Sequence, residues 1–116
     1  MRFLEIQDIA FEIVREENRY FISSYQICQK IEERNPELWE RICNEYPSEN
    51  ENIEMGAGTG RHYSPASFIA NALRYFYESG SYPALRQEYF SCERVFFEET
   101  IPGFTGNILG IWAWQE

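Results

Sequence analysis

Residues 64–80 read SPASFIANALRYFYESG, and this stretch predicts the best-defined helix in the chain. Ser64 followed by Pro65 is a typical helix start, because serine caps the first turn and proline suits the first helical position. Apolar side chains then recur at helical spacing as far as Gly80, a residue type that commonly follows the last turn. The apolar positions are Phe68, Ile69, Ala72, Leu73 and Phe76. We therefore predict a helix from Ser64 to Ser79.

Three more helices are predicted before this one. Residues 3–17 place their apolar side chains along one helical face, and residues 23–34 begin with a capping box. Residues 36–46 follow a second cap and carry their own apolar stripe. The short aromatic and β-branched run at 20–22 is long enough for a brief strand. The residues that mark these boundaries are Ser23, Gln26, Asn35, Pro36 and Pro47.

The chain after the Ser64 helix predicts a β-hairpin. Residues 94–101 and 108–115 are β-prone and are joined by the turn-rich segment PGFTGN. We assign no regular structure to residues 81–92, where Pro83 limits any strand to a sheet edge. In the last strand neither face is polar, which predicts either burial on both sides or a contact surface. One face carries Ile108, Trp112 and Trp114, and the other carries Leu109, Ile111 and Ala113.

This order of elements resembles the winged-helix variant of the helix-turn-helix class. The resemblance covers most of the chain and rests on element order. It implies that the short strand pairs with the hairpin, and that the helix from Ser64 to Ser79 takes the position of the helix that enters the DNA major groove. The extra helix at 36–46 and the insertion at 81–92 depart from the pattern. We predict a single α+β domain over residues 1–116, with about four helices and a winged-helix-like C-terminal hairpin.

The composition narrows the classes of partner. The chain of 116 residues has a formal net charge of −9, which opposes sequence-independent binding to nucleic acid or to an anionic membrane. Between Met55 and Tyr77 the charged residues are Arg61 and Arg74, so this stretch is locally positive. No apolar run is long enough to span a bilayer. The cysteines Cys28, Cys43 and Cys92 have no paired spacing and follow no signal peptide, which indicates a reducing cytoplasmic location.

The favoured hypothesis is a non-enzymatic module that binds another protein or a second copy of itself. The chain contains 9 Phe, 8 Tyr and 3 Trp, which supply an aromatic core and a surplus for an interface. The residues expected at this interface are Phe96, Ile108, Trp112 and Trp114.

The alternative hypothesis is a DNA-binding regulator, most plausibly a symmetric dimer, that uses the Ser64 helix. Its side chains could contact phosphates and base edges, since asparagine suits adenine and arginine suits guanine. The net charge favours the simpler interpretation that these residues form the solvated face of an amphipathic helix. The residues concerned are Arg61, His62, Ser64, Ser67, Asn71 and Arg74.

The third and weakest hypothesis is a ligand site or an enzyme around residues 56–63. Backbone N–H groups of a glycine-rich loop before a helix can bind anions, but this loop lacks the lysine and spacing of a P-loop. A flexible connector is the favoured interpretation. The residues of this weak site are Gly56, Gly58, Gly60 and His62. Neither a metal nor a cofactor is expected, because one histidine and three scattered cysteines lack the spacing of a zinc site.

Overall fold

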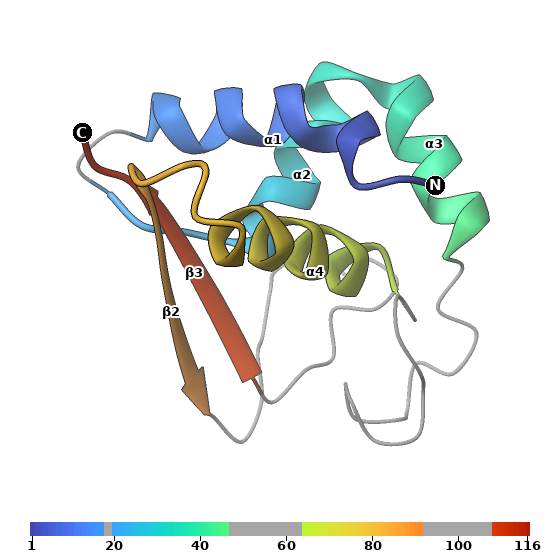
Figure 1. Ribbon diagram of the computed structural model, residues 1–116. Helices are drawn as coiled ribbons and strands as arrows, with labels where there is room; N and C mark the ends of the chain where they lie inside the picture. The colour runs from blue at the N-terminus through green and yellow to red at the C-terminus, as the bar shows by residue number, and fades with distance from the viewer. Residues whose placement is uncertain (18–19, 47–63, 92–107) are drawn as a thin grey trace.

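The structure is a computed structural model that describes residues 1–17, 20–46, 64–91 and 108–116 (Figure 1). These residues form the helices and strands α1 (Leu4–Glu16), β1 (Ile22–Ser23), α2 (Ser24–Arg34), α3 (Pro36–Glu45), α4 (Pro65–Glu78), β2 (Leu85–Ser91) and β3 (Ile108–Trp114). The predicted α+β class with a C-terminal hairpin is confirmed. Within the described residues, no helix has both the length and the apolar character needed to cross a membrane.

The helices begin where their capping residues predict. Ser23 Oγ accepts a hydrogen bond from the backbone N–H of Gln26, and the Gln26 side chain accepts one from the backbone N–H of Ser23. The side chains of Asn35 and Ser64 cap α3 and α4 by accepting the backbone N–H of Leu38 and Ser67, without a reciprocal bond. These bonds satisfy N–H groups that have no partner inside the helix. Gly80 follows α4 with a φ of 75°, a conformation that favours glycine.

The strands form one antiparallel sheet in the order β1-β3-β2. The short strand β1 thus pairs with the last strand of the hairpin, as the winged-helix resemblance implied. The assignment of residues 81–92 as irregular holds for 81–84 but is wrong for Leu85–Ser91, because β2 pairs with β3 along its whole length. The pairing with β3 decides this structure, because the charged residues Arg86 and Glu88 have low strand propensity. Among the described strands β2 lies at the edge of the sheet, as predicted from Pro83, and the strand predicted at 94–101 lies outside the described residues.

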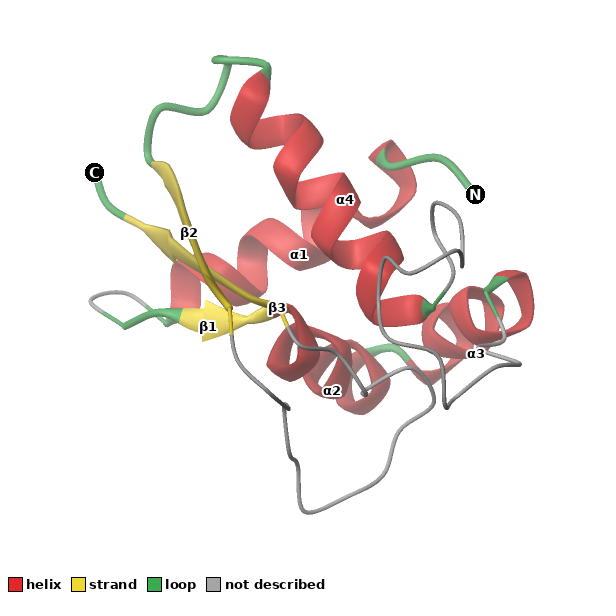
Figure 2. Cartoon of the chain, turned by 90° about the horizontal axis from the view of Figure 1, so that it is seen from below, coloured by secondary structure: helices red, strands yellow, loops and turns green. Residues whose placement is uncertain are grey.

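The core lies between the sheet and the helices. Figures 1 and 2 show the described helices gathered on one side of the sheet, with α1 and α4 beside it. The helices contribute the apolar faces that their periodicity predicted. The largest fully buried side chains include Ile6, Ile13, Tyr25, Ile27, Phe68, Ile69, Leu73, Phe76, Leu85 and Trp112.

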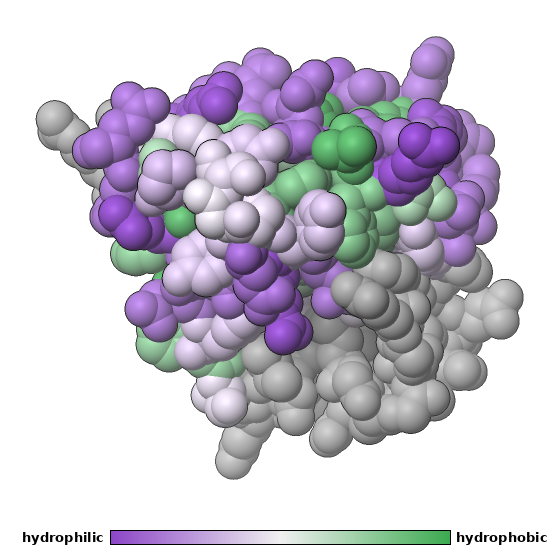
Figure 3. Space-filling view, viewed as in Figure 1, coloured by the Kyte–Doolittle hydropathy of each residue, from purple (hydrophilic) through white to green (hydrophobic). Residues whose placement is uncertain are grey.

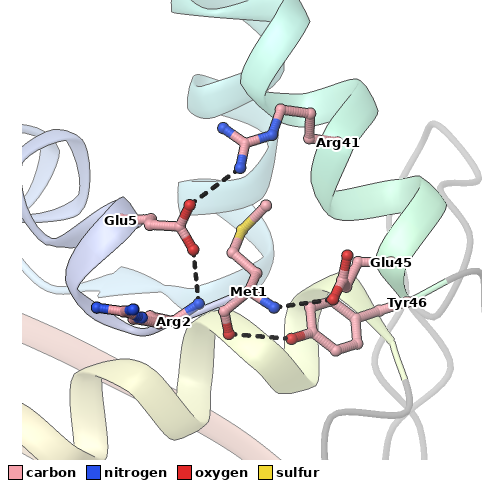
Figure 4. Close-up of polar contacts among 6 residues, drawn as sticks. All are labelled: Met1, Arg2, Glu5, Arg41, Glu45 and Tyr46. Carbon is pink, nitrogen blue, oxygen red and sulfur yellow. Dashed lines mark hydrogen bonds and ion pairs between the residues drawn. The ribbon is translucent and has the colours of Figure 1, made fainter.

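Polar contacts hold the start of the chain against α3 (Figure 4). Glu5 accepts a hydrogen bond from the backbone N–H of Arg2 at 2.7 Å and another from Arg41 Nη2 at 3.0 Å. Together these two bonds hold the pKa of the Glu5 carboxyl below its ordinary value. The N-terminal amine of Met1 lies 2.8 Å from Glu45 Oε1. Since these groups are largely exposed, each contact contributes little to stability.

Candidate functional site

The two faces of the sheet differ in what covers them. Opposite residues of antiparallel strands place their side chains on the same face. Ile22 lies opposite Trp112 and Leu85 lies opposite Trp114, so these residues share one face. Ile22, Leu85 and Trp112 are almost completely buried against the helices. We call this face the inner face.

The outer face carries the alternate side chains and is apolar along β3. Its opposite pairs are Phe90 with Leu109, Glu88 with Ile111, and Arg86 with Ala113. Phe90 is 53% exposed, while Leu109 and Ile111 are half-buried. A sheet face in contact with water normally alternates to polar side chains, and β3 does not. We call Phe90, Leu109 and Ile111 the outer strip.

Exposed aromatic side chains gather at the sheet. Phe21, directly before β1, is 51% exposed, and since Ile22 faces inward we expect Phe21 on the outer face. In the described part of the chain, the large exposed apolar or aromatic side chains are Leu4, Tyr20, Phe21, Tyr75, Tyr77, Tyr89 and Phe90. Most of them lie in or next to the sheet. Figure 3 shows hydrophilic residues along the upper rim, over α1 and α3, and paler residues below, over α4.

The predicted interface tryptophans lie on the inner face. Trp112 is completely buried, and its indole Nε1 donates a hydrogen bond to Ser24 Oγ at 2.9 Å. Trp114 is half-buried, with its ring centroid 5.3 Å from that of Phe11 and the Arg15 guanidinium 4.4 Å above it. Both side chains therefore pack the sheet against the helices. On the outer face Phe90 is exposed and Ile111 is half-buried, whereas Leu109 also packs against the core and Ala113 is buried.

The remaining predicted site residues are placed as follows. Ile108 begins β3 opposite Ser91. The residues that lie outside the described part of the chain are Gly56, Gly58, Gly60, Arg61, His62 and Phe96. Predictions that involve these residues stay predictions.

The residues predicted for DNA contact lie along α4. Ser64 is fully buried and caps the helix, with its Oγ accepting from the backbone N–H of Ser67 at 3.1 Å. Ser67 and Asn71 are half-buried. Arg74 is exposed, and its Nε donates to Glu78 Oε1 at 2.9 Å. The positive charge of Arg74 is therefore offset by a carboxylate one turn away.

Strand β2 has a free edge within the described structure. The backbone N–H of Gln115 donates to the carbonyl of Ala84 at 2.8 Å, which makes these residues a hydrogen-bonded pair in the ladder. Every second residue from Ala84 onward therefore directs its backbone N–H and C=O toward β3. The intervening residues, among them Gln87 and Tyr89, direct these groups away from β3. This edge is open to another strand.

Tyr89 lies where this edge meets α4. Its ring packs edge-on against that of Trp112, with centroids 6.3 Å apart. It also fills the space over Gly110, since a Cβ at that glycine would be 3.0 Å from the ring. Burial raises the pKa of the Tyr89 hydroxyl, which the Arg74 charge lowers and Glu78 raises. Tyr89 is nevertheless 43% exposed, so it lies at the boundary between core and surface.

The described residues offer no metal centre and no reactive thiol. They contain no group of three or more His, Cys, Asp or Glu side chains that could hold a metal ion. Cys28 is buried and Cys43 is half-buried, and both thiols are free. Burial raises the pKa of both, most strongly that of Cys28. Because the thiolate is the reactive form, these two cysteines act as packing residues.

Comparisons with protein-family models, with curated proteins and with solved structures give no match. Sequence reasoning missed Tyr89 and Phe90 as surface aromatics, because residues 81–92 were assigned no strand. The signal that could have found them is the alternation of Arg86 and Glu88 with Leu85 and its odd-numbered neighbours. This pattern has the period of two that a strand requires.

Proposed function

We propose that this protein is a cytoplasmic, non-enzymatic module that binds another protein through its C-terminal sheet. The observation that carries the proposal is the outer strip, where Phe90 is 53% exposed beside the half-buried Ile111, while Leu109 also packs against the core. The other face of the same strand already packs on the helices, and a second molecule that covers Phe90 and Ile111 would remove their apolar surface from water. The aromatic surplus predicted from the composition supports this proposal.

The surroundings of the outer strip have the anatomy of a binding surface. Apolar side chains occupy its centre, and the charged residues Arg86 and Glu88 lie beside them on β2. Protein interfaces typically combine an apolar centre with a polar rim and are enriched in aromatic side chains. Covering the strip would remove apolar area from water, at about 25 cal/mol for each Å². The strip therefore supplies a driving force for association.

Photo-crosslinking tests this proposal. A photo-reactive amino acid in place of Phe90 should yield a discrete adduct with a second polypeptide in cells that produce the protein. The same amino acid at Asp8, an exposed position of α1, is the matched control and should yield none. The adduct at position 90 should also disappear in an Ile111→Asp variant that retains the native circular dichroism spectrum. Equal labelling at positions 90 and 8 would contradict the proposal.

A second candidate function is DNA binding by α4. One observation favours it: β1 pairs with β3, and α4 directly precedes the hairpin, as the recognition helix does in the winged-helix arrangement. The ion pair between Arg74 and Glu78 and the net charge of −9 count against it. Titration of a fluorescent DNA duplex at low salt tests it, because counterion release favours binding most under that condition. If the duplex does not bind at low salt, DNA binding by α4 is rejected.

A further inference from the structure

We propose that the free edge of β2 pairs with β2 of a second copy, antiparallel and with Gln87 opposite Gln87 on the two-fold axis. The two sheets then form one continuous sheet, and the outer strips of the two copies adjoin each other. This inference rests on the proposed binding function and names its partner as the same chain. It is carried by two features of β2, its free backbone groups and its charge pattern.

The free backbone groups restrict the register. They belong to Gln87, Tyr89 and Ser91 and include the carbonyl of Leu85, whose N–H already donates to Tyr82. These odd-numbered residues direct N–H and C=O away from β3. In an antiparallel pair, hydrogen-bonded residues lie opposite each other. Odd-numbered residues of one copy must therefore face odd-numbered residues of the other. The two-fold axis of such a pair passes through a residue position of β2 and not between two positions.

The charges of β2 then select one position. An axis at residue 86 places arginine against arginine, and an axis at residue 88 places glutamate against glutamate. An axis at residue 89 places Glu88 against Phe90. Only an axis at Gln87 brings Arg86 of each copy opposite Glu88 of the other, which gives two ion pairs. These residues occupy non-hydrogen-bonded positions, where opposite side chains approach most closely.

With Gln87 on the axis, only a few backbone hydrogen bonds can form between the two β2 strands. Gln87 of each copy donates its backbone N–H to the Gln87 carbonyl of the other, and Tyr89 donates to the Leu85 carbonyl. The N–H of Leu85 already donates to the Tyr82 carbonyl at 3.0 Å. Pro83 has no N–H, so the ladder ends before it. The pairing therefore covers little more than β2, which fits a dimer of moderate affinity.

The Gln87 side chain gives a second reason to place the axis at this residue. Its Oε1 is the only buried side-chain nitrogen or oxygen among the described residues that has no hydrogen-bond partner. An amide carries both donors and acceptors, so two glutamines that face each other can satisfy one another. Rotation of the Gln87 side chain toward the free edge would bring it beside the same group of the second copy. The dimer thus provides the Gln87 Oε1 acceptor with a donor that it lacks among the described residues of one chain.

Charge reversal with mixing tests the register by sedimentation equilibrium. Arg86→Glu and Glu88→Arg each turn both ion pairs into like-charge pairs, so each variant alone should dissociate roughly tenfold more readily than the native dimer. An equimolar mixture of the two variants places opposite charges face to face at every pair and should recover the dimer. The double variant Arg86→Glu, Glu88→Arg keeps the composition and should dimerise like the native chain.

A proline substitution tests the backbone pairing. Gln87→Pro removes an N–H that points away from β3, so the fold should be retained while the dimer is lost. Glu88→Pro is the matched control, because its N–H faces β3 and its loss should destabilise the hairpin itself. Native circular dichroism together with a monomeric mass for Gln87→Pro supports the proposal.

The opposite results overturn it. A native chain that sediments as a monomer at all concentrations rejects self-pairing. The proposed binding function is then tested by the crosslinking at position 90. The mass of the adduct shows whether the crosslinked partner is a second copy or a different protein. A dimer that neither charge reversal weakens uses another surface. If both single variants dissociate and their mixture stays monomeric, the Gln87 register is wrong.

Discussion

Adjacent residues of β3 have opposite environments. Trp112 is completely buried and hydrogen-bonded to Ser24, whereas Ile111 beside it is only half-buried on the other face. The two faces are about equally apolar in sequence. What separates them is the set of helices, which lie on the inner side of the sheet (Figure 1). The same type of side chain therefore stabilises the fold on one face and is available for binding on the other.

The first way to test this contrast is an aromatic truncation on each face. Trp112→Ala should lower the free energy of unfolding by about 3 to 5 kcal/mol, because it removes buried area and leaves a cavity. Phe90→Ala on the outer face should lower it by about 1 kcal/mol or less, since Phe90 is already 53% exposed. Urea denaturation of both variants measures the difference.

Similar losses in the two variants would contradict the division into faces. That result would mean that the outer strip is covered in the native protein, for example by a second copy. Urea denaturation at two protein concentrations shows whether a second copy provides the cover, because stabilisation by association depends on protein concentration.

The sequence predicted the helices better than the sheet, and the reason is the range of the interactions involved. Ser23, Asn35, Ser64 and Gly80 act on backbone groups within a few residues, so their roles are visible locally. Strand β2 depends on β3, which lies 17 residues or more further along the chain. Its own residues include charges and follow a proline, so local propensity did not predict it.

The second test removes the hydrogen bond that anchors the inner face. Ser24→Ala should lower the free energy of unfolding by about 1 to 3 kcal/mol, because it leaves the buried indole N–H of Trp112 without its acceptor. Trp112→Phe in the Ser24→Ala background is the control, since it removes the unpaired donor. A double-mutant cycle should give a coupling energy of the order of 1 kcal/mol, and additive losses would show that the bond contributes nothing.

The candidate site was only partly predictable for a related reason. The sequence predicted that both faces of β3 are apolar, and this is what the structure shows. It could not indicate which face the helices cover, because that depends on how α1 and α4 pack. The tryptophans were therefore proposed for the interface, while the exposed positions are Phe90 and its neighbours on the outer strip.

The smallest expected effect concerns Tyr89, at the boundary between the two faces. Burial raises the pKa of its hydroxyl above the ordinary value, so the folded chain holds the proton at a pH where the unfolded chain releases it. The contribution of the protonated Tyr89 hydroxyl to the free energy of unfolding is fully present below about pH 10, the ordinary tyrosine pKa. It is lost as the pH rises through the shifted pKa. Burial also raises the pKa values of Cys28, Cys43 and Tyr46, which add to the alkaline loss.

Tyr89→Phe removes the contribution of Tyr89 to the alkaline loss of stability and keeps those of Cys28, Cys43 and Tyr46. Its urea midpoint should fall less than that of the native chain between about pH 8 and about pH 11, while the two midpoints stay close at the lower pH. An equal fall in both chains would mean that the hydroxyl of Tyr89 is as well solvated folded as unfolded. The Tyr89 hydroxyl would then lie in water, while the ring still packs against Trp112 and Gly110.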